Sequence, residues 1–526
     1  MRAAVTIRSI RTNFCGGRVR AAMAPLVLVA SSLMAADRTA PNPQASASPN
    51  EAVATGPSRI ERMALGGVFL EGTEDELAAA KEGYRYLLKE PLLTSDFDRE
   101  AFDNVWQVWP DTLRRRAEDA SLAQRRQMAM TRYGLTERPQ WGSDGMPEGS
   151  PDGRDESSAP MQYVVDSDGR WTMNCLSCHG GSIRGVASPG RPNARFALQT
   201  MTEELRATKL KLGKPLARMD FGAFLVPLGS THGTTNAVVF GMGLMNRRDG
   251  ELNLTPPSWQ TFTHHDMDAP PWWHFYRRPN LYIDGFAEKG HRGLMQFTLI
   301  PENGPEVFRE RENDFQNVYA FLSALRPPPY DGPIDQNLAE QGRVAFGEHC
   351  ASCHGTYGDS SPYPNRRVPL DVIGTDPVRL KALTVEGREK YARSWFSHFG
   401  EEDQQTTETD PDGYVAPPLD GVWASAPYFH NGSVPTLWHV LHPAQRPVVW
   451  RSSRGPMQHH GFDDERIGIA VETFCERPDD VDQKDPASIR SVFDTRRFGK
   501  SAAGHLFVDE LTESEKAAVL EYLKTL

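Results

Sequence analysis

Apolar residues recur at helical spacing in three stretches of the 526-residue chain. One stretch, residues 336–349, places apolar side chains at Leu338, Val344, Ala345 and Phe346. The other two, residues 318–325 and 519–526, share a similar aliphatic and aromatic pattern. Three consecutive prolines at 327–329 end the helix predicted over 318–325, because proline cannot continue a helix. The pattern predicts short helices joined by long loops, in keeping with 44 Gly and 40 Pro.

Two capping boxes predict where further helices begin. Thr73 is followed three residues later by Glu76, and Thr512 is followed at the same spacing by Glu515. In such a box each side chain satisfies a backbone N–H at the helix start. The box at Thr73 predicts an N-terminal helical extension, and the box at Thr512 predicts the closing helix of the chain.

The first 58 residues differ from the rest of the chain. Residues 1–36 contain five Arg and no acid, followed by an apolar run over 21–34 and small residues at its end. This order is typical of a secretory signal peptide, and the apolar run is short for a membrane anchor, which is the alternative. Residues 37–58 are rich in Ala, Pro and Ser and predict a disordered leader. We therefore expect a periplasmic or secreted protein without a membrane span after signal removal.

The charge balance argues against a nucleic-acid partner. The chain has 58 basic and 69 acidic residues, which gives a formal net charge of −11. Removal of the five arginines of the signal would make this charge −16. Binding to nucleic acid depends on a basic surface, so the composition favours other partners, including a small basic protein.

Four of the six cysteines lie in two copies of one motif. The copies are Asn174–Gly180 and His349–Gly355, and each contains Cys-x-x-Cys-His-Gly. This motif attaches c-type haem, because the two thiols can bind the two vinyl groups while the histidine ligates the iron. A zinc half-site and a redox dithiol are the alternatives, and both are disfavoured by the completed motif in an exported chain. The sequence predicts two covalent haems, with these attachment cysteines and iron ligands: Cys175, Cys178, Cys350, Cys353, His179 and His354.

The two motifs also predict the domain organisation. Each motif is followed by long loops and then by one of the two similar helices, so the prolines at 327–329 mark the best boundary. We expect a mainly α fold with two cytochrome-c-like haem domains. Residues 59–329 would form the first with its helical extension, and residues 330–526 the second. Cys475 lies outside both motifs, and we expect it to be a buried, inert thiol or part of an intermolecular bridge.

Residues 60–526 resemble the bacterial di-haem cytochrome c peroxidase superfamily, which includes a methylamine-dehydrogenase maturation enzyme and the di-haem rubber oxygenases. The resemblance rests on both haem motifs, on the Ala-Pro-Tyr-Phe-His-Asn-Gly segment at 426–432 and on residues 511–526. Within the superfamily, the second motif, the Trp272–Trp273 pair and residues 294–297 look most like the rubber oxygenases.

The resemblance implies different iron coordination at the two haems. At the C-terminal haem it implies a sixth ligand from His505, just before the closing helix, with His430 and Met457 as rivals. At the N-terminal haem residues 180–198 contain no histidine, which implies an open position. Histidines elsewhere remain possible ligands of that iron: His232, His264, His265, His274 and His291.

The resemblance also implies roles around the N-terminal haem. Trp272 and Trp273 would relay electrons, although ordinary core packing is the alternative for each. Three phenylalanines would line an apolar pocket, two carboxyl groups are candidates for an acid that protonates a leaving oxygen, and Asn236 would contribute to a possible Ca²⁺ site. These phenylalanines and acids are Phe275, Phe286, Phe297, Asp284 and Glu288.

The expected function is that of an exported di-haem c-type cytochrome oxidoreductase. Its N-terminal haem would activate hydrogen peroxide, as in cytochrome c peroxidases, or O₂, and its C-terminal haem would transfer electrons. A small exported electron-donor protein or a small-molecule oxidant would be its partner. The alternatives are a rubber-oxygenase-like dioxygenase that cleaves an alkene polymer, a non-catalytic di-haem electron carrier, and a structural protein stabilised by zinc or disulfides.

Overall fold

The computed structural model describes the chain from residue 60 onward, with internal gaps. The described ranges are 60–139, 159–225, 248–249, 251–252, 265, 267–300, 302–358, 361–398, 405–453 and 461–526. The predicted signal peptide at 1–36 and leader at 37–58 therefore lie outside the described residues, as do Asn236, His232, His264 and Met457. Among the described helices, none is both long and apolar enough to cross a membrane.

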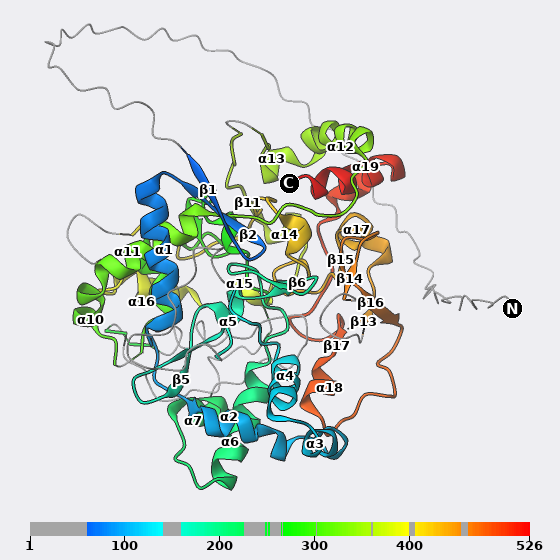
Figure 1. The fold of residues 1–526 in the computed structure, drawn as a ribbon. Helices are drawn as coiled ribbons and strands as arrows, with labels where there is room; N and C mark the ends of the chain where they lie inside the picture. Colours follow the sequence, from blue (N-terminus) through cyan, green and yellow to red (C-terminus); the bar gives the residue numbers. More distant parts are fainter. Residues whose placement is uncertain are drawn as a thin grey trace, which may run out of the picture. The chain divides into compact units, whose positions relative to one another are not determined.

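The most extensive contacts between elements of the described chain are made by two helix pairs (Figure 1). In the first pair, α1 (Glu74–Lys89) packs against α11 (Glu312–Ala324). In the second pair, α12 (Gln336–His349) packs against α19 (Glu513–Lys524). The capping boxes at Thr73 and Thr512 are both formed, which confirms the predicted helix starts. The sequence predicted α1 only as an N-terminal extension, but its packing makes it the partner of α11.

Each helix pair crosses closely at a glycine. A Cβ on Gly83 of α1 would lie 2.1 Å from the carbonyl oxygen of Asn317, and one on Gly342 of α12 would lie 1.9 Å from that of Ala518. Any side chain at these positions would push the helices apart. The two pairs therefore have the same mode of contact, in which a glycine of one helix meets a backbone carbonyl of the other.

Substitution of Gly342 by alanine is expected to destabilise the fold by about 1–3 kcal/mol, because the added methyl overpacks the α12–α19 contact. Gly347 of the same helix provides the matched control, since a Cβ there meets nothing within 4 Å. Its replacement by alanine should stabilise the protein by roughly 0.5–1 kcal/mol through helix propensity. Thermal and denaturant unfolding of both variants measure the difference. Equal effects of the two substitutions would contradict this account of the crossing.

The remaining described helices lie within the long connections between the two helices of each pair. The α-helices are α2 (Arg99–Asn104), α3 (Asp111–Glu118), α4 (Leu122–Tyr133), α5 (Leu176–His179), α6 (Leu198–Lys211), α7 (Arg218–Leu225), α9 (His291–Leu294), α10 (Pro305–Glu310), α13 (Ala351–His354), α14 (Leu370–Ile373), α15 (Val378–Ala382), α16 (Val385–Arg393), α17 (Leu437–Leu441) and α18 (Pro486–Arg490). The 3₁₀ helices are η1 (Val105–Val108), η4 (Trp272–His274), η5 (Met295–Thr298), η6 (Val422–Ala424), η7 (Pro443–Gln445) and η8 (Leu506–Glu510).

The strands form several small antiparallel sheets. Three sheets have three strands: β1 (Glu61–Leu65), β2 (Val68–Gly72) and β10 (Leu325–Arg326); β3 (Phe97–Asp98), β5 (Arg170–Met173) and β4 (Tyr163–Val165); β16 (Val471–Phe474), β13 (Val449–Ser452) and β17 (Val492–Asp494). The paired strands are β6 (Ser182–Ile183) with β7 (Val186–Ala187), β8 (Asn280–Leu281) with β9 (Ala287–Glu288), β11 (Arg367–Pro369) with β12 (Gly413–Val415), and β14 (Phe462–Asp463) with β15 (Gly468–Ile469). The fold is thus mixed but rich in helix, in agreement with the predicted mainly α class.

Two main hydrophobic cores lie inside residues 60–526. The larger core contains side chains of both helix pairs, so it extends across the prolines at 327–329. The smaller core gathers aromatic side chains of the α2–α4 region, β5 and α6, including Phe97, Tyr133 and Trp171. Residues 60–526 form one compact unit, and the boundary at 329/330 between two haem domains stays a prediction.

Candidate functional site

The second motif is presented by the end of α12. That helix ends at His349, and the motif follows at once, with its histidine at the end of α13. The Nδ1 of His354 lies 2.8 Å from the carbonyl oxygen of Pro417 and donates to it. This contact leaves Nε2 as the free ring nitrogen, which is the usual state of a metal-binding histidine. Burial lowers the pKa of His354, so the imidazole is neutral and able to bind a metal.

A second imidazole faces His354. The ring centroids of His354 and His505 are 6.2 Å apart, and the ring planes meet at 60°. Two imidazoles that bind one metal from opposite sides, at about 2 Å each, have centroids roughly 6 Å apart. Burial, followed by the nearby His354, lowers the pKa of His505 to about 3. The separation and the neutral rings both fit a metal held between the two histidines.

The space between these histidines is a cavity of about 480 Å³. Cys350 and Cys353 line the cavity, and both thiols are free of disulfides. The walls are largely apolar side chains of α12, α17 and α19, among them Phe346, Leu437 and Leu523. Two free thiols, two facing imidazoles and an apolar wall are the set of groups that a covalent haem needs. The residues around the second motif therefore fit haem c.

The rival ligand His430 lies in the same cavity but does not pair with His354. Its ring packs on Tyr414 with centroids 4.4 Å apart. Desolvation lowers the pKa of His430 to about 3, so this half-buried histidine is neutral. The facing position belongs to His505, which has a left-handed backbone (φ +53°) and whose N–H donates to the Ile373 carbonyl at 2.7 Å.

The first motif begins at the end of β5. Asn174 fixes this junction, because its side-chain amide donates to the carbonyls of Leu87 and Met161 while its oxygen accepts from the N–H of Leu176. Leu87 belongs to α1, so the first helix pair is tied directly to the motif. The thiols of Cys175 and Cys178 are free of disulfides.

The histidine of the first motif is half-buried and packs against a tryptophan. The rings of His179 and Trp272 stack with centroids 4.6 Å apart and an interplanar angle of 21°. Burial lowers the pKa of His179 to about 3, and a contact with the Pro270 backbone acts in the opposite direction. The imidazole is therefore neutral, as a metal ligand must be, and Trp272 fixes its orientation.

A short tripeptide repeat, not among the predicted signals, lies near both motif histidines. Residues 269–271 and 416–418 are both Ala-Pro-Pro. Pro417 of the second copy accepts the hydrogen bond from His354, and the backbone of Pro270 in the first copy lies close enough to His179 to affect its pKa. A search of the chain for repeats outside the cysteine motifs would have found this signal. Both motif histidines thus have the same kind of backbone neighbour.

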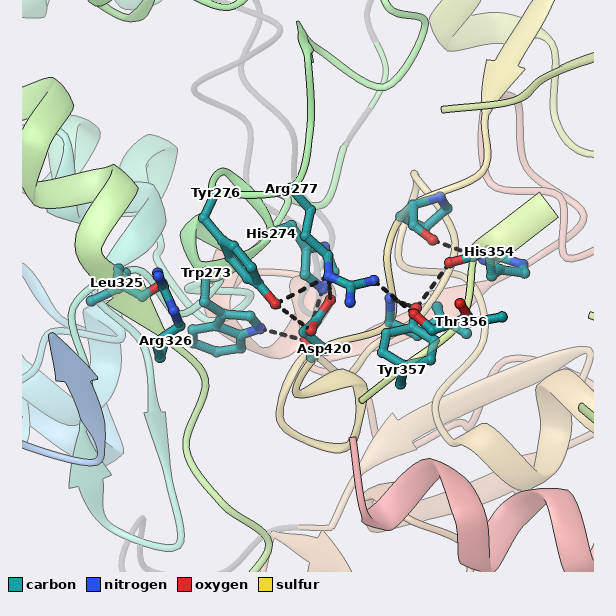
Figure 2. Close-up of polar contacts among 12 residues, drawn as sticks. Trp273, His274, Tyr276, Arg277, Leu325, Arg326, His354, Thr356, Tyr357 and Asp420 are labelled. Atoms are coloured by element: carbon teal, nitrogen blue, oxygen red, sulfur yellow. Dashed lines mark hydrogen bonds and ion pairs between the residues drawn. The ribbon is translucent and has the colours of Figure 1, made fainter. Parts of the chain in front are cut away.

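Trp273 contacts Asp420, in the loop that also holds the partner of His354 (Figure 2). It is fully buried, and its Nε1 donates to the backbone carbonyl of Asp420 at 2.9 Å. His274 donates to the same oxygen at 2.9 Å. Asp420 lies three residues after Pro417, the partner of His354. Trp272 therefore contacts His179 of the first motif, and Trp273 contacts the loop that holds His354 of the second motif.

Polar side chains continue this connection around Asp420. Its carboxylate accepts from the Tyr276 hydroxyl at 2.6 Å and lies 3.4 Å from the Arg277 guanidinium. Arg277 also donates to the Thr356 carbonyl, and the Tyr357 hydroxyl donates to the carbonyl of His354 at 3.0 Å (Figure 2). The loop after the second motif is thereby fixed to the segment that carries both tryptophans.

Several proposed residues of the N-terminal haem have other partners. His274 bonds to Asp420, and His291 lies 2.5 Å from a carboxylate oxygen of Glu312. Neither is therefore arranged as a ligand of the first iron. His265 is buried, and His232 and His264 lie outside the described residues. The open position of that iron stays a prediction.

Both candidate acids have other partners, and the predicted phenylalanine pocket stays a prediction. Asp284 is fully buried between Arg379 (3.1 Å) and Arg388 (2.9 Å), and these cations lower its pKa, so it is an ionised structural group. Glu288 accepts from the N–H of Thr406. Phe297 packs against the smaller core, whereas the other two phenylalanines belong to the larger one. Cys475 is exposed, so the expectation of a buried thiol was wrong.

A comparison with known protein families matches the segment that contains Pro417, the hydrogen-bond partner of His354. A family model described as "RoxA-like, cytochrome c-like" matches residues 413–451. This segment contains Pro417, Asp420 and His430.

Two curated relatives come from Sinorhizobium fredii (strain NBRC 101917 / NGR234). The protein named uncharacterized protein y4iM is 33% identical over 210 residues, which covers 36% of this chain and 45% of the relative. Uncharacterized protein y4iJ is 28% identical over 269 residues, with 39% and 42% covered. The chain thus spans less than half the length of these relatives. The matched segment, together with the cavity that it lines, identifies a cytochrome c-like domain in the C-terminal part of this chain, similar to RoxA-like proteins.

Proposed function

We propose that this chain is a di-haem c-type cytochrome oxidoreductase with two unequal centres. The observation that carries the proposal is the facing pair His354–His505 at the second motif, beside a first motif whose histidine stacks on Trp272. A haem iron with two protein ligands transfers electrons, whereas one with a single protein ligand can also bind an oxygen-derived oxidant. The second centre would accordingly pass electrons, and the first would react with hydrogen peroxide or O₂.

The residues around the motifs would divide the work. Cys175 and Cys178 would attach one haem, and Cys350 and Cys353 the other. Pro417 holds the Nδ1 proton of His354, which keeps Nε2 directed at the iron position. At the first motif, Trp272 holds the His179 ring by stacking.

Trp272 and Trp273 would carry electrons between the centres. Trp272 touches the ring of His179, and Trp273 donates to Asp420 in the loop that begins at Pro417. Hydrogen bonds of Asp420 with Tyr276 and of Tyr357 with His354 hold the residues beside this path in place. The arrangement supports the predicted relay, because adjacent indoles join the two histidines' surroundings without passing through solvent-exposed side chains.

A second candidate function is oxidative cleavage of an alkene polymer by O₂. The match of residues 413–451 to a RoxA-like model favours it over a purely electron-carrying role. In both candidates the first centre reacts and the second supports it, and they differ in the oxidant and the organic substrate.

We also propose that the chain is exported and works outside the cytoplasm, with a small exported electron-donor protein as partner in the peroxidase case. The arginine-rich, acid-free residues 1–36 with their apolar run support export. The acidic net charge supports electrostatic steering of a basic donor. Protein isolated from the periplasm or medium should lack residues 1–36, as N-terminal sequencing would show.

The function is tested on the purified holoprotein in three steps. The alkaline pyridine adduct should give two haems per chain, and the oxidised spectrum should contain a high-spin component that shifts on addition of cyanide. Turnover is then measured with hydrogen peroxide plus a reduced cytochrome, beside O₂ plus an alkene polymer. Two low-spin haems that cyanide leaves unchanged would refute the enzyme and favour the electron carrier. Absence of covalent haem would favour the structural alternative.

A further inference from the structure

A separate small cavity lies beside the segment that follows the first motif. Its volume is about 80 Å³. No residue of either haem motif (174–180 and 349–355) lines it. Polar and basic side chains line it together with apolar ones, including Thr136, Arg191, Asn193, Arg195, Ala426 and Phe462. Among its described lining residues there are three arginines and no aspartate or glutamate.

One of these arginines already has its charge balanced. Arg184 forms ion pairs with Asp331 and Asp464. The other two, Arg191 and Arg195, form no ion pair with a carboxylate in the described part of the chain. Arg191 is 8% exposed, and within the described ranges only its Nε has a protein partner, the carbonyl of Ala424 at 2.7 Å.

Both unbalanced arginines are held in an environment that disfavours their charge. Burial, followed by the proximity of Arg195, lowers the pKa of Arg191 to about 9. Burial also lowers the pKa of Arg195. The carboxyl group that approaches Arg191 is that of Asp268, but burial raises its pKa well above the usual range, and it lines the cavity of the second motif. It therefore supplies little compensating charge.

Two neighbouring cations without a counterion, one buried (Arg191) and one half-buried (Arg195), are costly, and an anion between them would offset that cost. Guanidinium groups bind carboxylates and phosphates through paired N–H donors. A water molecule needs about 10–15 Å³ of such space, so a cavity of 80 Å³ can hold a group of several heavy atoms. Gly461 helps to keep the space open, since a Cβ there would lie 3.1 Å from the Arg195 guanidinium.

We propose that Arg191 and Arg195 form a binding site for a small oxyanion, a carboxylate or phosphate group, in this cavity. The site would fasten the segment after the first motif to the C-terminal loop, because Arg191 bonds to Ala424 and the cavity is also lined by Ala426.

The oxyanion group can come from either of two sources, a haem propionate or a free anion. The segment is bonded directly to the first motif, since Asn193 donates to the Cys178 carbonyl at 2.7 Å and Gly190 to that of His179 at 2.6 Å. A propionate side chain of a haem attached there could supply the carboxylate. A free inorganic anion from solution could supply it instead.

The test uses the purified holoprotein and the Arg195→Gln variant. Melting temperatures are measured against inorganic phosphate, with chloride at equal ionic strength as the salt control. If the anion is free, phosphate stabilises the wild type in a saturable way, and Arg195→Gln weakens this response at least about tenfold. Arg184→Gln is the matched control, because that arginine lines the same cavity but has carboxylate partners. It should keep the phosphate response.

A haem propionate gives a different result. Phosphate then has no specific effect, but Arg195→Gln lowers the melting temperature and makes the reduction potential of one haem more negative, since a cation beside the propionate is lost. The proposal is overturned if phosphate has no specific effect and Arg195→Gln leaves both potentials unchanged while the melting temperature stays the same or rises. A rise would mean that the substitution only removed an unpaired buried charge. Neither readout depends on turnover, so failure here is separable from failure of the proposed oxidoreductase function.

Discussion

Replacement of His505 by alanine is expected to convert the haem at the second motif from low spin to high spin while both covalent haems remain. The reason is the facing geometry: His505 is the imidazole that lies opposite His354, with ring centroids 6.2 Å apart. Loss of one strong axial nitrogen leaves that iron with a single protein ligand. Electronic absorption and electron paramagnetic resonance spectra of the oxidised protein measure the change, and the pyridine adduct counts the haems.

His430→Ala provides the control for this substitution. His430 lines the same cavity, but its ring packs on Tyr414 and does not face His354. Its loss should disturb packing and leave the second haem low spin. An unchanged spectrum in His505→Ala, or a spin change in His430→Ala alone, would transfer the sixth-ligand role away from His505.

Replacement of Trp273 by phenylalanine should slow turnover about tenfold or more, equivalent to ~1.4 kcal/mol in the barrier, without changing either haem spectrum. Phenylalanine keeps most of the buried volume but lacks the Nε1–H that donates to Asp420, and its ring is harder to oxidise than indole. Trp272→Phe should slow turnover in the same way, since it removes the indole stacked on His179. Steady-state turnover and the rate of electron transfer between the haems after rapid reduction are the measurements.

Trp450→Phe is the matched control for the tryptophan variants. Trp450 is also fully buried, and its Nε1 donates to the Ser433 carbonyl at 3.1 Å. It lies in β13 and has no contact with either motif histidine among the described ring pairs and hydrogen bonds. Its substitution should cost about the same stability, 1–3 kcal/mol for a lost buried hydrogen bond, and leave turnover unchanged. Equal slowing in all three variants would assign the effect to stability instead of electron transfer.

The helices at the edges of the chain were predictable because their signals are local. Thr73 and Thr512 begin helices through contacts with residues three positions away, and proline ends a helix through its own backbone. The role of α1 was not predictable in this way. Its partner α11 begins more than 200 residues later, and the contact depends on Gly83 meeting Asn317, which no local pattern encodes.

The candidate site also has one part that local sequence signals predict and another part that depends on contacts between distant residues. The cysteines and histidines of the two motifs are neighbours in sequence, so their spacing alone predicts covalent haem and the first iron ligand at each motif. His505 lies about 150 residues from His354, and its assignment needed the resemblance until the fold brought the two rings together. The same is true of Asp284, which looked like a candidate acid until two arginines from α15 and α16 were found to hold it ionised.

The sequence by itself determined where the two Cys-x-x-Cys-His motifs and the capped helix starts lie, and it predicts the haem chemistry that we propose, because each signal lies in residues a few positions apart. The tertiary structure alone decided which imidazole faces His354, that Trp272 stacks on His179 while Trp273 bonds to Asp420, and that Arg191 and Arg195 share a cavity. These relations join residues far apart in the chain. Their distance, burial and charge follow from packing of the whole fold, which no local pattern specifies.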